Sequence, residues 1–263
     1  MSSVAFVTGA GRGIGEAVAT RLAADGWRVA VAARSADQLE RVADVTGALA
    51  VPLDVTDAGA VSAAVRRVTE ELGPVELLVN NAGAGGSGGP TWAKEPAAWW
   101  GVFEVNVLGS FLCARAVLPL MSERRSGRIV NVASNAAFFA IDDEFDARID
   151  SAYLASKAAL VRLTEALAAE ARGNGISVFA ISPGMVKTDM TESTFADIWD
   201  DESVWTPPER TADLVAFVAS GALDGYSGRY IHAANDDWES MPDRVEAVMA
   251  DDLHAMRLRE ASR

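Results

Sequence analysis

The sequence is poor in the side chains that form disulfides and bind metal ions. Cys113 is its only cysteine, and it contains just two histidines. A single cysteine excludes an internal disulfide, and two histidines without companion cysteines do not supply the ligands of a zinc centre. We therefore expect no metal site and no redox chemistry on the chain's own side chains.

Long apolar runs and positive charge are also scarce. No apolar run approaches the roughly 20 residues that a membrane-spanning helix requires. The strand-like residues 4–7 follow Met1 with no charged leader between them, so a cytoplasmic location is expected. Lys and Arg number 23 against 37 Asp and Glu, and the resulting net charge of −14 repels phosphate backbones. We expect neither a membrane nor a nucleic acid as partner.

Short apolar runs alternate with segments of helical period along most of the chain. Such alternation is typical of βαβ units around a parallel sheet. The runs predict strands at 4–8, 29–33, 48–53, 75–79, 128–132, 176–181 and 229–231, with a long helix at about 96–120 and another at about 151–173. The pattern favours an α/β fold with a doubly wound parallel sheet flanked by helices, and the length favours one domain spanning 1–263.

A glycine-rich turn joins the first expected strand to the first expected helix. Glycines let backbone amides and the helix N-terminus approach a pyrophosphate closely. The residues predicted to hold a dinucleotide here are Thr8, Gly9, Gly11, Arg12, Gly13, Ile14 and Gly15. The spacing is not the usual G-x-G-x-x-G, because Ile14 stands in the third glycine's place. Taken alone, the segment also fits a tight connection that binds no ligand.

The end of the second expected strand carries Arg34 where an acid would bind the ribose hydroxyls of NAD. Arg34 and Arg12 together would grip the 2′-phosphate of NADP through charge-assisted hydrogen bonds, so NADP is the predicted cofactor. The alternative is that both are ordinary surface arginines. Asp54 follows the third strand, where it would bind the adenine amino group or merely cap a turn.

Tyr153 and Lys157 are spaced i, i+4 at the start of an expected helix, so their side chains lie on one face. A neighbouring cation lowers the pKa of a phenol, which makes tyrosine a better proton-transfer group near neutral pH. The same spacing is common in surface pairs without function. Other motifs have to decide between these interpretations.

Those motifs are the segment 8–15, Asn80–Gly83, Asn106, Ser134, the segment 153–157 and Pro183-Gly184. In this order they resemble the short-chain dehydrogenase/reductase family, in its single-domain form with a Rossmann-like fold, over about residues 4–236. The resemblance implies that Tyr153 donates a proton to the substrate oxygen and that Ser134 hydrogen-bonds the same oxygen. It implies that Lys157 also binds the nicotinamide ribose.

The resemblance assigns further roles. Asn106 would hold a water that links Lys157 to solvent, the alternative being a polar residue that bends its helix. Asn80 would line the adenosine side, and Thr188 would contact the nicotinamide amide or the phosphates. The other cofactor contacts implied are Val55, Asn81, Ala82, Gly83, Pro183, Gly184 and Val186.

Two stretches depart from the family pattern. The loop 135–150, between Ser134 and Tyr153, is enlarged, and its aromatic residues would wall an apolar substrate pocket or simply pack as a solvated flap. The chain also continues well past its last strand, where the pattern predicts a helical extension at about 240–258 that docks on its own subunit or on a neighbour. The loop at about 185–206, rich in Met, Phe and Trp, is the expected substrate loop.

The sequence thus predicts an NADP(H)-dependent oxidoreductase that interconverts a small carbonyl compound and its alcohol. A 3-oxoacyl-carrier-protein reductase is the runner-up, which the acidic surface disfavours because the carrier is acidic as well. A non-catalytic NADP-binding sensor and a pure assembly subunit are the alternatives from other classes. The resemblance implies a homodimer or homotetramer.

Overall fold

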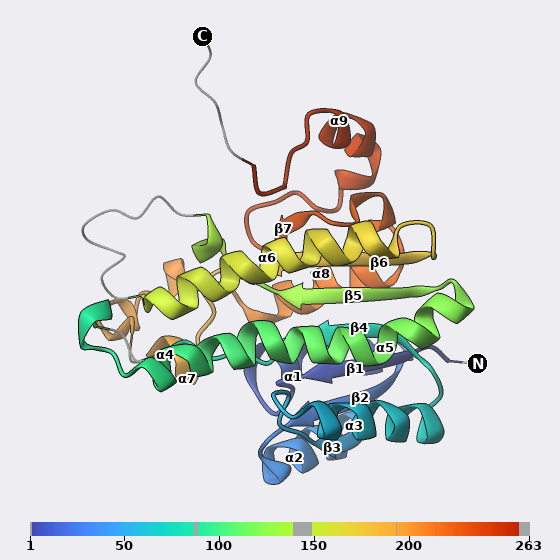
Figure 1. Cartoon of the computed structure of the whole chain (residues 1–263), viewed down its shortest axis with the longest axis horizontal. Helices are drawn as coiled ribbons and strands as arrows, with labels where there is room; N and C mark the ends of the chain where they lie inside the picture. The colour runs from blue at the N-terminus through green and yellow to red at the C-terminus, as the bar shows by residue number, and fades with distance from the viewer. Residues whose placement is uncertain (1, 87–88, 139–148, 193, 258–263) are drawn as a thin grey trace.

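The computed structural model describes residues 2–86, 89–138, 149–192 and 194–257. Its centre is one seven-stranded parallel sheet of order β3-β2-β1-β4-β5-β6-β7 (Figure 1). The strands are β1 Val4–Thr8, β2 Arg28–Ala33, β3 Leu49–Pro52, β4 Val75–Asn80, β5 Gly127–Val132, β6 Ile176–Ser182 and β7 Tyr230–His232. The predicted doubly wound parallel sheet is confirmed, and each expected strand lies within a few residues of its predicted bounds.

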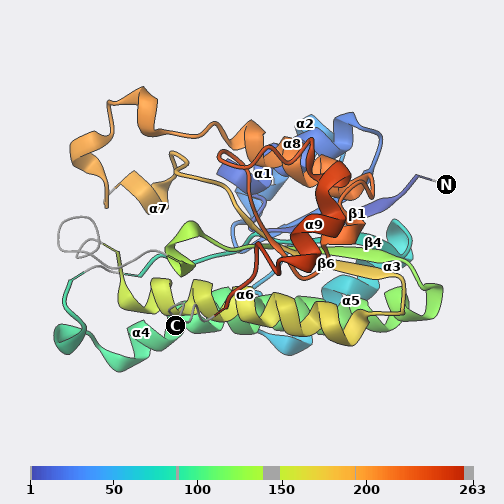
Figure 2. The same ribbon diagram turned by 90° about the horizontal axis from the view of Figure 1, so that it is seen from above.

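Helices cover both faces of the sheet (Figure 2). One layer holds α1 Gly13–Ala24, α2 Ala36–Thr46 and α8 Pro208–Ala219, and the other holds α3 Ala58–Glu71, α5 Ser110–Arg124 and α6 Ser151–Ala171. The shorter helices are α4 Pro96–Phe103, α7 Asp189–Glu192 and α9 Val245–Ala250. Successive strand residues point to opposite layers, as in Phe6 and Val7, both fully buried. Strands buried on both faces read as continuous apolar runs, as these do.

The predicted long helix is interrupted in the middle. Between α4 and α5 the chain forms a π-helical stretch, Glu104–Gly109, and the helical path then continues to Arg124. The whole stretch Pro96–Arg124 is long and apolar enough to cross a membrane, but its α5 part packs Leu112 and Val117 into the core beneath the sheet. Core packing accounts for the apolar residues on the buried side of this stretch, of which 44% is buried.

The C-terminal extension is helical over a shorter range than predicted. A 3-10 turn at Met241–Arg244 leads into α9, which ends at Ala250 rather than near residue 258. Asp252 and His254 have positive φ angles of 50° and 57°, which no α-helix accommodates. The extension docks on its own subunit, because the Tyr226 hydroxyl donates to the Met241 carbonyl at 2.6 Å.

The turn between α6 and β6 packs against the turn between α5 and β5, and two of its glycines allow this packing to be tested. Gly173 and Gly175 both have positive φ, 87° and 69°, so alanine at either position is strained by about 1–2 kcal/mol. Only at Gly175 would the added Cβ also meet backbone, 2.0 Å from the Arg125 carbonyl oxygen, whereas nothing lies within 4 Å at Gly173. We expect Gly175→Ala to lower the free energy of unfolding by about 2 kcal/mol more than Gly173→Ala, measured by urea denaturation. Equal losses would contradict this packing.

Candidate active site

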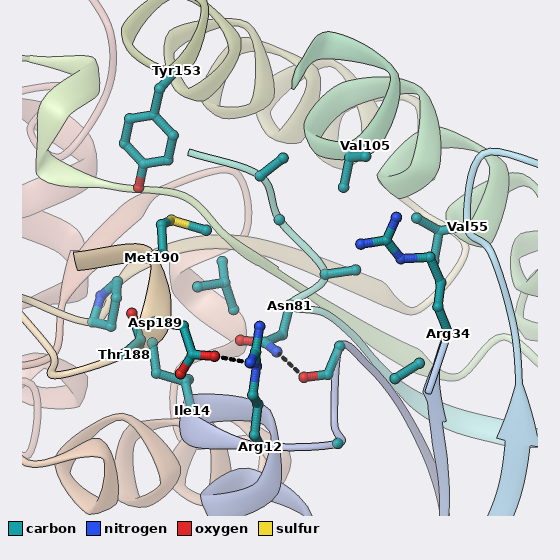
Figure 3. Close-up of a pocket in the computed structure, with 18 of the residues that line it drawn as sticks. Arg12, Ile14, Arg34, Val55, Asn81, Val105, Tyr153, Thr188, Asp189 and Met190 are labelled. Atoms are coloured by element: carbon teal, nitrogen blue, oxygen red, sulfur yellow. Dashed lines mark hydrogen bonds and ion pairs between the residues drawn. The ribbon is translucent and has the colours of Figure 1, made fainter. Parts of the chain in front are cut away.

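The loops at the carboxyl ends of the strands enclose an elongated cavity of about 700 Å³ (Figure 3). Tyr153 and Arg34 lie on opposite sides of it. Most of the predicted cofactor residues line this cavity: Gly9, Gly11, Arg12, Ile14, Arg34, Asp54, Val55, Asn81, Ala82, Gly83, Tyr153, Lys157, Pro183, Gly184, Val186 and Thr188. Thr8, Gly13 and Gly15 are not among the lining residues. The cavity occupies the position where ligands bind in doubly wound sheets.

Thr8 has a structural role at the base of this cavity. Its hydroxyl oxygen accepts hydrogen bonds from the backbone N–H groups of Asn81 and Ala82, both at 3.1 Å. The side-chain amide of Asn81 in turn donates to the carbonyl oxygens of Thr8 and Gly9, both at 3.0 Å. Gly9 has a φ of +63°, and a Cβ there would lie 2.8 Å from the Ala82 Cα. The glycine turn and the β4 loop are therefore locked against each other with no room for a side chain.

Two arginines reach the cavity from the turns after β1 and β2. Arg12 pairs with Asp189 of α7, and both side chains are more than half exposed (Figure 3). Arg34 is exposed and is close enough to Asp54 for its positive charge to lower the pKa of that carboxyl. The two arginines thus lie in one cavity, one with a carboxylate partner from the segment after β6.

Asp54 caps a turn, which was one of its two predicted roles. Its Oδ1 accepts from the Thr56 backbone N–H at 2.9 Å and from the Thr56 hydroxyl at 2.7 Å. These two hydrogen bonds, with a smaller contribution from the Arg34 charge, lower the pKa of Asp54. The residue also lines the cavity, so an adenine contact remains a prediction.

Ser134 and Tyr153 border a second, smaller cavity of about 340 Å³. Ser134 follows β5 and Tyr153 lies in the first turn of α6, and the Ser134 hydroxyl is close enough to the phenol to lower its pKa. Tyr153 is the catalytic candidate that lines both cavities. The structure therefore brings the two predicted proton-handling groups together at the junction of a long and a short cavity.

The electrostatics of Tyr153 differ from the prediction. Burial raises the pKa of Tyr153, and the neighbouring Ser134 hydroxyl offsets this only in part. The Lys157 Nζ donates to the Val132 carbonyl at 2.7 Å and lies 5.6 Å from the centre of the Tyr153 ring. Burial also lowers the pKa of Lys157 to about 8. The expected lowering of the tyrosine pKa by lysine is therefore wrong.

Asn106 is fully buried in the π-helical stretch and fastens two segments together. Its Oδ1 accepts from the Ala84 N–H at 2.8 Å, and its Nδ2 donates to the Ala84 carbonyl at 3.0 Å and to the Ser156 hydroxyl at 2.9 Å. Asn106 thereby ties the loop after β4 to α6 beside the catalytic pair. The local π-helix agrees with the helix-bending interpretation, and the water relay stays a prediction.

An ion pair at the start of α6 was not predicted from the sequence. Lys94 and Asp150 contact at 2.5 Å with side chains 6% and 3% exposed, and Asp150 also caps α6 through the Ala152 N–H at 2.7 Å. Nothing in the sequence connects two residues so far apart. His232, which lines the smaller cavity, was missed as well, because a lone histidine after a short strand carries no motif.

The enlarged loop is described only at its ends, since 139–148 lie outside the described residues. Of its predicted aromatic wall, Phe138 packs edge-on against Tyr230 with ring centres 4.7 Å apart. From the predicted substrate loop, Met185, Met190, Phe195 and Val204 line the smaller cavity. The apolar lining expected of the substrate loop is therefore present.

Comparison with known proteins identifies the family. A family model described as short chain dehydrogenase matches residues 3–199. The chain belongs to the short-chain dehydrogenase family. Its relatives include the 2-(R)-hydroxypropyl-CoM dehydrogenase of Xanthobacter autotrophicus, which is 42% identical over 73% of this chain and 78% of its own.

Two further short-chain dehydrogenase relatives are reductases by name. The 3-oxoacyl-[acyl-carrier-protein] reductase of Staphylococcus aureus is 34% identical over 88% of this chain and 96% of its own. A solved variant of actinorhodin polyketide ketoreductase with NADPH superposes with a TM-score of 0.79, at 33% identity, over 88% of this chain and 95% of its own. This short-chain dehydrogenase thus shares its fold with enzymes that act on hydroxyl and carbonyl groups.

The buried Lys157 gives this short-chain dehydrogenase a pH dependence of stability. Because the pKa of Lys157 is lowered to about 8, the folded protein holds fewer protons than the unfolded chain between about pH 8 and 10.4. Stability rises with pH wherever the unfolded state binds more protons. We expect the difference in free energy of unfolding between the wild type and Lys157→Met to shift in favour of the wild type by about 3 kcal/mol from pH 7.5 to pH 10.5.

Urea denaturation at several pH values measures this difference, and the other titrating groups cancel between the two proteins. A difference that stays constant with pH would show that Lys157 keeps its ordinary pKa in the folded protein.

Proposed function

We propose that the chain is an NADP(H)-dependent oxidoreductase that reduces a small carbonyl compound to an alcohol or catalyses the reverse reaction. One observation carries the proposal: Tyr153, whose pKa the neighbouring Ser134 hydroxyl lowers, lines both the elongated cavity and the smaller one. A proton-transferring group at such a junction faces the cofactor on one side and the substrate on the other. Ser134, Tyr153, Lys157 and Asn106 are the catalytic residues of the proposal.

The elongated cavity suits a dinucleotide with an additional phosphate. Backbone and small residues shape the end near the glycine turn, and Arg12 and Arg34 bring positive charge to it. No acid stands at the end of β2 to bind a 2′-hydroxyl. Asp189 pairs with Arg12, and a phosphate group would compete for this arginine. The related ketoreductase was solved with NADPH, which supports the same cofactor here.

A nicotinamide cofactor held by residues of the elongated cavity would supply the hydride for the carbonyl carbon. The Ser134 hydroxyl donates a hydrogen bond to the carbonyl oxygen and stabilises the negative charge that develops there. Tyr153 gives its hydroxyl proton to this oxygen, which completes the alcohol and leaves a phenolate. Lys157, within reach of the ring, stabilises the phenolate and holds the nicotinamide ribose. Asn106 supports the water that returns the proton.

The raised pKa of Tyr153 suits the proposed direction of proton transfer. With a raised pKa, Tyr153 keeps its proton at neutral pH, as a general acid for reduction must. The positive charge of an oxidised nicotinamide and of Lys157 would lower that pKa for the reverse reaction.

A 3-oxoacyl-carrier-protein reductase is the second candidate. The identity with the Staphylococcus aureus enzyme favours it, and the net charge of −14, which repels an acidic carrier, disfavours it. A non-catalytic NADP-binding sensor would bind the cofactor without turnover.

The proposal includes the wider organisation of the protein. One domain spans 1–263, with the substrate loop at about 185–206, and the enzyme works in the cytoplasm as a homodimer or homotetramer. Exposed apolar side chains along the α4–α5 path support an assembly through these helices: Trp100 is 55% exposed, Leu108 41% and Phe111 40%.

Replacing Tyr153 with Phe tests the mechanism. The change removes only the hydroxyl, so NADPH binding followed by fluorescence should stay close to that of the wild type. We expect kcat for reduction of a panel of ketones and aldehydes to fall about 10²–10⁴-fold. Turnover at the wild-type rate would overturn the proposed role of Tyr153.

Replacing Arg34 with Ala tests the choice of cofactor. Loss of charge-assisted hydrogen bonds to the 2′-phosphate should weaken NADPH about 10–100-fold and leave NADH almost unaffected. Arg41→Ala, an exposed arginine further along α2 that does not line the cavity, is the matched control and should change neither Kd. Equal losses for the two cofactors in Arg34→Ala would argue against phosphate recognition.

A further inference from the structure

His232 is a histidine in the wall of the smaller cavity that the proposed mechanism does not use. It is the last residue of β7 and pairs in register with Ser182, the last residue of β6. The next strand in the sheet, β5, leads into Ser134. Three neighbouring strands therefore deliver Ser134, Ser182 and His232 to the same edge of the sheet, around the proposed substrate site.

The hydrogen bonds of the ring fix which nitrogen carries the proton. Nδ1 accepts from the backbone N–H groups of Ala234 at 3.2 Å and Asn235 at 3.1 Å. A nitrogen that accepts two hydrogen bonds cannot carry a proton, so a neutral ring must carry it on Nε2. Burial lowers the pKa of His232, with the Asp236 carboxylate opposing this effect. The ring is therefore neutral near pH 7 and has one donor, Nε2–H.

This donor has no acceptor within the part of the chain that the structure describes. Nε2 makes none of the hydrogen bonds of His232. The atom is also not fully buried, so it can be reached from the cavity, although the residue as a whole is only 7% exposed. A donor held rigidly in a substrate cavity is the kind of polar group that fixes the orientation of a ligand.

The surroundings restrict what this donor can bind. At about 340 Å³ the cavity has room for a small molecule, and apolar residues such as Met185, Phe195 and Val204 form much of its wall. Asp150, the carboxylate among the described lining residues, is paired with Lys94, and none of these lining residues is a lysine or arginine. A neutral donor in a wall without such a cation favours a neutral acceptor over a carboxylate or phosphate, whose charge would be desolvated without a counterion.

We propose that His232 determines specificity by donating a hydrogen bond from Nε2 to a second, uncharged oxygen of the substrate, such as the carbonyl of a keto ester or diketone. The inference rests on the proposed function. Ser134 and Tyr153 bind the oxygen of the carbonyl group that is reduced, and His232 binds the second oxygen. The substrate class is thus a small neutral compound with two oxygen acceptors.

The test compares matched pairs of substrates: 3-oxo, 4-oxo and 5-oxo ethyl esters, each with the ketone in which the ester carbonyl is replaced by methylene. The measured quantity is the ratio of kcat/KM for ester and ketone. We expect a ratio of at least about ten for one pair in the wild type, and its loss in His232→Asn. Asparagine keeps an acceptor at the Nδ1 position for the two backbone N–H groups but has no donor at the Nε2 position.

Two further variants separate specificity from folding. His232→Gln returns a donor to the Nε2 position and should restore part of the ratio. His254→Asn changes the only other histidine, which does not line the cavity, and should keep the wild-type ratio. A wild-type ratio near one for every pair, or equal losses for ester and ketone in His232→Asn, would overturn the inference. Failure of the wild type to reduce any carbonyl compound with NADPH would instead overturn the proposed function.

Long-range ¹H–¹⁵N spectra of the imidazole rings provide a readout that does not depend on turnover. With two histidines in the chain, the spectrum of His254→Asn assigns the His232 signals. We expect the neutral ring with its proton on Nε2 at pH 7.5. A proton on Nδ1 would overturn the inference even if the ester is preferred.

Discussion

The hydrogen bonds between Thr8 and the β4 loop are the constraint on which the proposed active site depends. They join the carboxyl ends of β1 and β4, neighbouring strands from which the chain continues to opposite layers of helices. The Asn81 side-chain amide donates to the Thr8 and Gly9 carbonyls, so the glycine turn is held in place at the carboxyl end of β1. Asn106 makes a similar connection: its side chain hydrogen-bonds both the loop after β4 and α6. The elongated cavity is thus built from loops that hydrogen bonds connect to one another.

Buried polar groups near the proposed site are hydrogen-bonded to the backbone. Lys157 is bonded to the Val132 carbonyl and His232 to two backbone N–H groups. Such bonds repay the cost of burial and fix each side chain in one orientation. Groups held in this way need less reorganisation during binding and reaction.

Much of the fold was predictable because local patterns and global architecture agree. Continuous apolar runs predicted the strands, and the glycine turn and the Tyr-x-x-x-Lys segment lie, as predicted, after β1 and at the start of α6. What the sequence did not reveal depends on contacts between distant residues. The Arg12–Asp189 pair, the Lys94–Asp150 pair and the direction of the Lys157 ammonium all require the tertiary structure. The early end of α9 follows from backbone angles at Asp252 and His254 that carry no distinctive sequence signal.

The C-terminal extension has a consequence for the sheet as a whole. β7 is an outermost strand, and the Tyr230 N–H donates to the His254 carbonyl at 2.8 Å while the Tyr230 carbonyl lies 2.9 Å from the His254 ring. An open strand edge invites pairing with a strand from another molecule, which is a common start of aggregation. By occupying the polar groups of Tyr230, the extension shields that edge, so the chain past the last strand also protects the protein against edge-to-edge association.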